Sequence, residues 1–349
     1  MRITICGGGN LGHVVAGFLS SQKENHVSLL TTRPHEWASE IEVVDCSGKV
    51  FHGKLEQISA EASEVINGRD LVIVCLPGFA IHDVLMEIRP YLSPETIVGT
   101  VVSSTGFFFE AMQILPENQP LFGFQRVPFI SRIIDYGHSA ALKGYKESLS
   151  VAVEQTADKE KVRSLLEELF CAPTKLLDSY YEVSLSNSNP LLHTARLYSL
   201  WKDWEQGISY DSNPGFYEAW TVETSELYIA MDKEFQILLK RIGVKDGAIP
   251  SVLQYYESHD AESLTKKISS ISAFKGIASP MKADKFGKYV PDFTSRYFTE
   301  DFPYGMRFIV EVAEKNQVEV PIIQHVYKWG MKMIHQYAPS KTLRTRFIA

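Results

Sequence analysis

Cysteine is scarce in this sequence, and its few copies are widely separated. The 349 residues include four, Cys6, Cys46, Cys75 and Cys171. They lie mostly inside apolar stretches, so the sequence shows neither a Cys-x-x-Cys metal pattern nor a compact disulfide framework. We therefore expect a reduced, cytoplasmic protein that has no bound metal.

Long apolar runs and an excess of basic charge are also missing. No stretch approaches the roughly 20 apolar residues of a membrane span. The first 19 residues superficially suggest a signal peptide, but three glycines and Asn10 interrupt the apolar run that such a peptide requires. The net charge of -7 argues against general attraction to nucleic acid or anionic lipid. We expect small-molecule partners, no nucleic acid and no membrane, and leave a homodimer open.

The length exceeds the roughly 250–300 residues at which a single core stops growing, so two domains are expected. The first, residues 1–183, alternates short apolar runs with helical periodicity, which predicts an α/β domain with a doubly wound parallel sheet of the Rossmann type. A hairpin at 42–55 interrupts this pattern. The predicted strands are 2–6, 27–30, 70–76, 96–102, 121–129 and 148–153, and the predicted helices are 10–19, 80–92 and 158–170.

The second domain, residues 184–349, has helical spacing throughout, and we expect it to be all-helical. A cluster of turn-forming residues at 209–215 ends one helix, so that a new helix starts near Phe216. Gly243 is a plausible C-terminal cap for that helix. The segment from Pro339 is left unassigned. The predicted helices are 190–204, 216–242, 249–258, 304–316 and 321–337.

A glycine-rich turn follows the first predicted strand and precedes the first predicted helix. Gly7, Gly9 and Gly12 satisfy the pattern Gly-x-Gly-x-x-Gly. In this context the glycines permit a tight turn, close approach of a pyrophosphate and close packing of the helix, whose N-terminus attracts anions. The sequence therefore predicts a dinucleotide site. The residues expected to contact the cofactor are Gly7, Gly9, Asn10, Leu11, Gly12, Thr32, Arg33 and Pro77.

The end of the second strand bears on the choice between NAD and NADP. NAD-binding folds usually place an acidic residue there to bind the ribose hydroxyls, whereas Leu30 is followed here by Thr31, Thr32 and Arg33. An arginine can pair with a 2′-phosphate through two hydrogen bonds, and a threonine hydroxyl can add another. A solvated arginine before Pro34 is the alternative. The sequence favours NADP and leaves NAD open.

Two motifs in the second domain contain residue types that suit catalysis. Asn189-Pro190-Leu191-Leu192-His193 opens a helix, with Asn189 as the expected N-cap and His193 one turn later on the same side. Taken alone, this spacing favours a capping asparagine and a core histidine. The second motif runs from Arg296-Tyr297 through Glu300-Asp301 to Pro303 and Gly305. Taken alone, it fits a surface ion pair and acidic residues at a helix start.

Together the two motifs and their order resemble the opine dehydrogenases, the octopine and nopaline dehydrogenase family. That family joins a dinucleotide domain to a helical domain with Asn-Pro-x-x-His and Arg-Tyr-x-x-Glu-Asp-x-Pro-x-Gly motifs, and the resemblance covers nearly the whole chain. It implies reductive condensation of an amino acid with a 2-oxo acid, in which hydride reduces an imine. It also implies His193 as general acid/base, Asp301 as its orienting partner, Arg296 as a carboxylate anchor and Asn189 as a further polar contact. Asn187 is an alternative to Asn189.

Two other functions remain open on the sequence. A reductase similar to ketopantoate reductase, or to the 3-hydroxyacid and glycerol-phosphate dehydrogenases, has the same architecture and favours a catalytic lysine. Lys233 and Lys240 on the long predicted helix are candidates, although such lysines usually face solvent. A nucleotide sensor that has lost its chemistry is the second alternative, because fold does not determine function.

Overall fold

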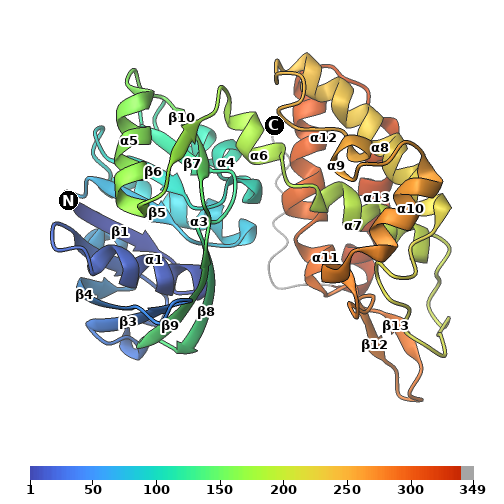
Figure 1. Cartoon of the computed structure of the whole chain (residues 1–349), viewed down its shortest axis with the longest axis horizontal. Coiled ribbons are helices and arrows are strands. Elements are labelled where there is room, and N and C mark those ends of the chain that lie inside the picture. Colours follow the sequence, from blue (N-terminus) through green and yellow to red (C-terminus); the bar gives the residue numbers. More distant parts are fainter. Residues whose placement is uncertain (339–349) are drawn as a thin grey trace. The chain divides into compact units, whose positions relative to one another are not determined.

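The computed structural model describes residues 1–338, and contacts divide the chain into two compact units. Unit 1 is Met1–Ser186, and unit 2 starts at Asn187. Figure 1 shows strands together with helices in unit 1 and mostly helices in unit 2. The segment from Pro339, which the sequence left unassigned, lies outside the described residues.

Unit 1 is built on a sheet whose centre is parallel. Strand β1 (Arg2–Cys6) lies between β2 (His26–Leu30) and β5 (Leu71–Val74) and runs parallel to both. Strands β6 (Ile97–Thr100) and β7 (Leu121–Phe124) extend the parallel part. This arrangement confirms the predicted Rossmann-type fold. The order in the described chain is β11-β10-β7-β6-β5-β1-β2-β4-β3-β9-β8.

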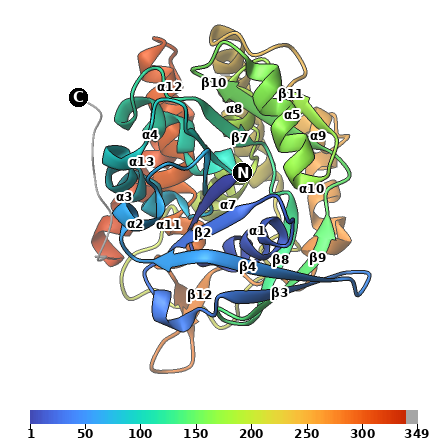
Figure 2. The ribbon, with the colours of Figure 1, turned by 90° about the vertical axis from the view of Figure 1, so that its left-hand side faces the viewer.

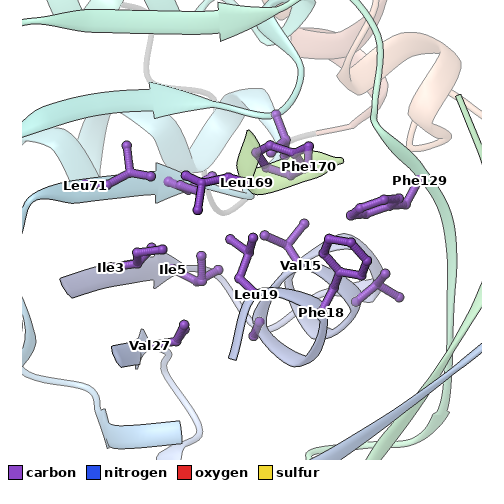
Figure 3. Close-up of a cluster of buried hydrophobic side chains, with 14 of the residues drawn as sticks. Ile3, Ile5, Val15, Phe18, Leu19, Val27, Leu71, Phe129, Leu169 and Phe170 are labelled. Atoms are coloured by element: carbon purple, nitrogen blue, oxygen red, sulfur yellow. The ribbon is translucent and has the colours of Figure 1, made fainter. Parts of the chain in front are cut away.

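The central strands are buried on both faces, which explains their continuous apolar sequence. On one face, Ile3 and Ile5 pack with helices α1 (Asn10–Ser20) and α5 (Lys159–Phe170). Figure 3 shows this core, with Phe18 of α1 and Phe129 facing each other at a ring-centroid distance of 4.9 Å. The other face packs against α2 (Ala62–Val65), α3 (Gly78–Ile88), α4 (Phe107–Ile114) and α6 (Tyr180–Leu185).

The edges of the sheet differ from the prediction of a parallel sheet. The predicted hairpin is present as β3 (Glu40–Asp45) and β4 (Val50–Ser59), but β4 also pairs in parallel with β2 and so joins the main sheet. On the other side, β10 (Leu149–Glu154) is antiparallel to β7 and pairs with β11 (Thr174–Leu176). The sheet is therefore mixed.

A second hairpin escaped the sequence analysis. Strands β8 (Phe129–Asp135) and β9 (Ser139–Tyr145) pair with each other, and β9 joins β3, as Figure 2 shows at the lower edge of unit 1. Ile130 and Ile134 of β8 are exposed, so the apolar alternation that identifies a half-buried strand is weak. We refer to this feature as the β8–β9 hairpin.

Unit 2 is dominated by helices, and α7 (Asn189–Trp201) packs against α8 (Val222–Arg241) and α13 (Pro321–Tyr337). The helix expected from Phe216 begins instead at Val222, where the Thr221 side chain caps it, and residues before it form a turn. A small hairpin and two helices, α10 and α11, were not predicted, and because of the hairpin the unit is not entirely helical. The elements are α7 (Asn189–Trp201), α8 (Val222–Arg241), α9 (Val252–Tyr255), α10 (Ala261–Ser270), β12 (Met281–Ala283), β13 (Tyr289–Pro291), α11 (Arg296–Thr299), a π-helical turn (Phe302–Met306), α12 (Arg307–Lys315) and α13 (Pro321–Tyr337).

Short 3-10 turns complete the two units at Pro34–Glu36, Arg89–Tyr91, Ser103–Thr105 and Ser272–Phe274. Among residues 1–338, none of the helices combines the length and apolar character that crossing a membrane requires.

Candidate active site

The glycine turn of unit 1 has the geometry of a dinucleotide loop. Gly7 has a φ of +117°, and a Cβ on Gly12 would lie 1.9 Å from the Gly7 carbonyl oxygen, so helix α1 packs directly beneath the loop. A Cβ on Gly9, by contrast, would meet no atom within 4 Å. The backbone at Gly9 is thus open to a ligand, at the N-terminus of a helix that attracts phosphate.

The β8–β9 hairpin holds this loop from the side. The His13 ring lies with Nδ1 2.9 Å from the Gly9 carbonyl, while the Gly137 N–H donates to Nε2 at 2.8 Å. These contacts assign the neutral tautomer with the proton on Nδ1, and burial lowers the pKa of His13. Asn10, a predicted cofactor residue, accepts a hydrogen bond from the Ile133 N–H at 2.8 Å. Its side chain therefore fixes the hairpin against the loop.

A cavity of about 380 Å³ opens beside the glycine loop. Arg33 lines it and lies over the Tyr136 ring at 3.9 Å, while its guanidinium also pairs with Glu36 at 3.2 Å. The exposed glycine backbone, the cation and the flat aromatic ring suit a dinucleotide. Of the predicted contacts, the cavity is lined by Gly7, Gly9, Thr32 and Arg33 but not by Asn10, Leu11, Gly12 or Pro77.

The predicted residues outside the lining have other positions. Leu11 is partly buried against the core, and Pro77 is the N-cap residue of α3. Acidic side chains absent from the prediction, Asp83 and Glu87 of α3, line the cavity. Burial and the nearby Glu61 raise the pKa of Glu87. Sequence reasoning missed these two residues because the sequence of a helix does not show which of its faces borders a cavity.

In unit 2 the two motifs come together. His193 on α7 and Asp301 meet with Nδ1 and Oδ2 2.8 Å apart, across 108 positions of sequence. The π-helical turn that follows Asp301 packs closely against α7 because Gly305 has no side chain: a Cβ there would lie 2.6 Å from the Pro190 ring. An ionised carboxylate only accepts hydrogen bonds, so Nδ1 holds the proton and the lone pair on Nε2 can accept a hydrogen bond. The geometry is that of a histidine oriented by a carboxylate.

Aromatic side chains surround His193. The Tyr217 hydroxyl lies 2.8 Å from Nε2, and the Tyr297 ring meets the imidazole edge at a centroid distance of 4.8 Å. Burial, together with nearby groups such as Asp301, raises the pKa of both tyrosines. Sequence reasoning missed Tyr217, since a helix was expected to start near Phe216 and no motif marks this tyrosine.

The polar residues proposed beside the dyad are more exposed. Arg296 forms a two-bond ion pair with Glu300, at 2.7 and 2.8 Å, and its side chain is 82% exposed. Asn189 is not the N-cap residue: Ser188 takes that position without a side-chain bond, and Asn189 is the first residue of α7 and exposed. Asn187 Oδ1 accepts the Asn189 N–H at 3.2 Å, because the turn before the helix folds back on itself.

One buried cation was also not anticipated. Arg196, on α7, is 2% exposed and donates from Nε to the Phe216 carbonyl at 2.9 Å. Burial lowers the pKa of this guanidinium to about 10, and no carboxylate is paired with it in residues 1–338. The lysines that a ketopantoate-reductase mechanism would use, Lys233 and Lys240, are both exposed on α8.

Comparison with known proteins agrees with this geometry. Residues 176–334 match the model of the NAD/NADP octopine/nopaline dehydrogenase α-helical domain, and residues 3–124 match the ketopantoate reductase model. Tauropine dehydrogenase of Arabella iricolor is 28% identical over 95% of this chain and 91% of its own. Octopine dehydrogenase of Pecten maximus is 27% identical over 96% of this chain and 90% of its own.

The structural comparison gives the same relationship. A structure of octopine dehydrogenase with NADH and L-arginine has a TM-score of 0.84 and 25% identity, covering 96% of this chain and 90% of that one. A ketopantoate reductase from Ralstonia eutropha, at 14% identity and a TM-score of 0.62 over 96% of this chain and 99% of its own, shares the fold.

A glycine-loop dinucleotide unit joined to a helical unit with a His–Asp pair defines an NAD(P)-dependent dehydrogenase. The matches to tauropine dehydrogenase and octopine dehydrogenase extend over nearly the whole chain and so include both units. Over nearly its whole length the chain is similar to opine dehydrogenases, and its helical unit matches the octopine/nopaline dehydrogenase family model.

Proposed function

We propose that the protein condenses the amine of an amino acid with a 2-oxo acid and reduces the resulting imine to a secondary amine dicarboxylate. The observation that supports this best is His193, fixed by Asp301 at 2.8 Å and held ready to exchange a proton through Nε2. The nicotinamide cofactor supplies the hydride. The protein's own residues supply the proton chemistry and bind the substrates.

Histidine suits the dehydration that precedes reduction. A carbinolamine must lose its hydroxyl as water, and an imidazolium can donate the required proton because the ordinary pKa of histidine, about 6.5, lies near neutral pH. Asp301 stabilises the imidazolium and holds the ring in place. Imidazole then takes up a proton when the reaction runs in reverse.

The direct test is a screen of amino acids crossed with 2-oxo acids, following the loss of reduced cofactor. We expect oxidation of cofactor with a 2-oxo acid when an amino acid is also present, and not without it. A ketopantoate-type reductase would need no amine, and the match of residues 3–124 is the observation in favour of that second candidate. Tight cofactor binding without turnover over the whole panel would instead support a sensor.

Arg296 is proposed to bind a substrate carboxylate. Its ion pair with Glu300 is exposed, and exposed pairs contribute little to stability. A substrate carboxylate can therefore replace Glu300 as the partner of the guanidinium. Replacing Arg296 with Gln removes the charged, two-bond contact, so we expect KM for the 2-oxo acid to rise about 10–100-fold, the effect of about 1.5–3 kcal/mol for a hydrogen bond to a charged group. Steady-state kinetics measures this change.

Glu300→Gln provides the matched control for that variant, because it frees the guanidinium without removing it. We expect KM to stay the same or fall. An unchanged KM in Arg296→Gln would exclude Arg296 as the anchor. Arg196, a buried cation without a paired carboxylate, would then be the next residue to test.

We propose NADP as the preferred dinucleotide, with NAD accepted. Support comes from Arg33 in the cavity lining, held flat over Tyr136 beside Thr32. A guanidinium in that position can pair with a 2′-phosphate. Octopine dehydrogenase has been solved with NADH, so this relative binds the unphosphorylated cofactor.

Arg33→Asp tests this preference. We expect NADPH affinity to fall by about 10–100-fold, through loss of a charge-assisted hydrogen bond of about 1.5–3 kcal/mol, while NADH affinity changes less or improves. Fluorescence titration with both cofactors gives the two dissociation constants. Equal changes for NADPH and NADH would show that Arg33 does not read the 2′-phosphate.

A further inference from the structure

Both ring nitrogens of His193 are occupied by oxygen atoms of the protein. Asp301 Oδ2 lies 2.8 Å from Nδ1, and the Tyr217 hydroxyl lies 2.8 Å from Nε2. A general acid/base that acts directly on substrate needs one nitrogen open to the reacting atom. In this arrangement the nitrogen that should face the substrate faces a tyrosine.

The proton positions follow from what each group can do. The carboxylate accepts, so Nδ1–H donates to Asp301 and the lone pair of Nε2 accepts from the Tyr217 O–H. When Nε2 is protonated, the same contact reverses, because the phenol oxygen can also accept a hydrogen bond. The Tyr217 proton can then be donated to another acceptor, either the neighbouring Tyr297 hydroxyl or a bound substrate.

The Tyr217 side chain is held by packing and is not a mobile surface group. Its ring stacks on Phe274 at a centroid distance of 4.0 Å and an angle of 17°, and it lies parallel to Trp220 at 6.3 Å. The backbone carbonyl just before it accepts the bond from buried Arg196 at 2.9 Å. With 5% of the residue exposed, the hydroxyl is fixed against the imidazole.

We propose that Tyr217 passes the proton between His193 and the substrate, which makes Asp301, His193 and Tyr217 a three-member relay. This inference rests on the proposed function and assigns the group that acts at the substrate end. Because burial raises the pKa of the phenol, it stays protonated and passes protons by exchange, without forming a stable tyrosinate.

The relay step conserves both protons and charge. As the carbinolamine C–O bond breaks, the leaving hydroxyl takes the Tyr217 proton and departs as water. The Tyr217 oxygen takes the proton of Nε2–H at the same time, and imidazolium becomes neutral imidazole. In the reverse reaction, water adds to the imine, Tyr217 takes a proton from it, and His193 takes the proton of Tyr217.

Tyr217→Phe is the informative variant, because it keeps the stacked ring and removes the hydroxyl. We expect turnover to fall by a factor on the order of 10²–10⁴, the usual contribution of a positioned proton-transfer group, with KM and cofactor affinity almost unchanged. Tyr198→Phe is the matched control. Tyr198 lies on α7, the helix that also contains His193, and its hydroxyl lies 2.9 Å from His325 Nε2. The variant removes this other tyrosine–histidine hydrogen bond and should leave turnover at the wild-type level.

A proton inventory separates a relay from a positioning role. In single-turnover reactions across mixtures of H₂O and D₂O, two protons moving together give the wild type a curved dependence on deuterium fraction, and Tyr217→Phe should give a straight line. Turnover of Tyr217→Phe within about twofold of wild type would overturn the relay. A linear or flat wild-type inventory would also overturn it, even if the variant did not fold.

Failure of the proposed function would be seen separately. If the wild type reduces a 2-oxo acid without an amine, the condensation is wrong. The same two measurements, made on that reaction, still decide whether Tyr217 relays the proton.

Discussion

His193→Ala is expected to lower turnover by a factor on the order of 10²–10⁴ while NAD(P)H affinity stays almost unchanged. In the proposed mechanism the imidazole supplies and takes up the proton through Tyr217, and the cofactor loop belongs to the other unit. Stopped-flow or steady-state kinetics gives the turnover, and cofactor fluorescence gives the dissociation constant. Thermal unfolding of the variant controls for damage to the buried aromatic cluster around the ring.

The partner of the imidazole provides the stricter test. Asp301→Asn keeps the size of the side chain and removes the charge that stabilises imidazolium, so turnover should also fall. Residues that act as one unit are not additive, and the double variant should lose little more than His193→Ala alone. Additive losses would mean that the 2.8 Å contact is a cap or core contact without a shared role in proton transfer.

The glycine loop gives the second large effect, and two neighbouring glycines separate binding from stability. Gly9→Ala should leave the melting temperature unchanged, because the added methyl meets no protein atom within 4 Å. The added methyl would instead enter the space where the pyrophosphate would lie. At a cost of about 1–3 kcal/mol for an extra methyl in a packed space, cofactor affinity should fall about 5–150-fold.

Gly12→Ala should weaken both properties. Its methyl would lie 1.9 Å from the Gly7 carbonyl oxygen, so the loop and helix α1 must move apart. Calorimetry or thermal unfolding, combined with cofactor titration, measures both effects. A drop in melting temperature for Gly9→Ala, or wild-type cofactor binding by that variant, would contradict a pyrophosphate site above Gly9.

The parts of the fold that the sequence predicted correctly are those with strong local signals. Strand β1 and helix α13 have the predicted bounds, because a continuous buried run and a sustained helical period leave few alternatives. The β8–β9 hairpin was missed, because its apolar residues are partly exposed. The helix expected from Phe216 starts six residues later, since the Phe216–Tyr217 turn is buried by aromatic partners from distant segments.

The same distinction between local sequence signals and tertiary contacts applies to the residues of the site. Resemblance identified His193 and Asp301, and the structure brings them together. Spacing alone could not do this, because the contact joins segments that are distant in sequence. Tyr217, Arg196 and Tyr136 escaped prediction for the same reason: each is defined by what the tertiary structure places beside it, and no short motif contains it.

The support that the β8–β9 hairpin gives to the glycine loop has a consequence for the order of folding. Asn10 and His13 are bonded to residues 123 and 124 positions further along the chain. Contacts of such long sequence separation form late, because the intervening loop must first be closed. At about 5–20 residues per second, the ribosome reaches the hairpin on the order of 10 s after it has made helix α1. The nascent chain can therefore form its first strands and helix early, yet it acquires a finished nucleotide loop only when residues around Gly137 have emerged and folded back onto it.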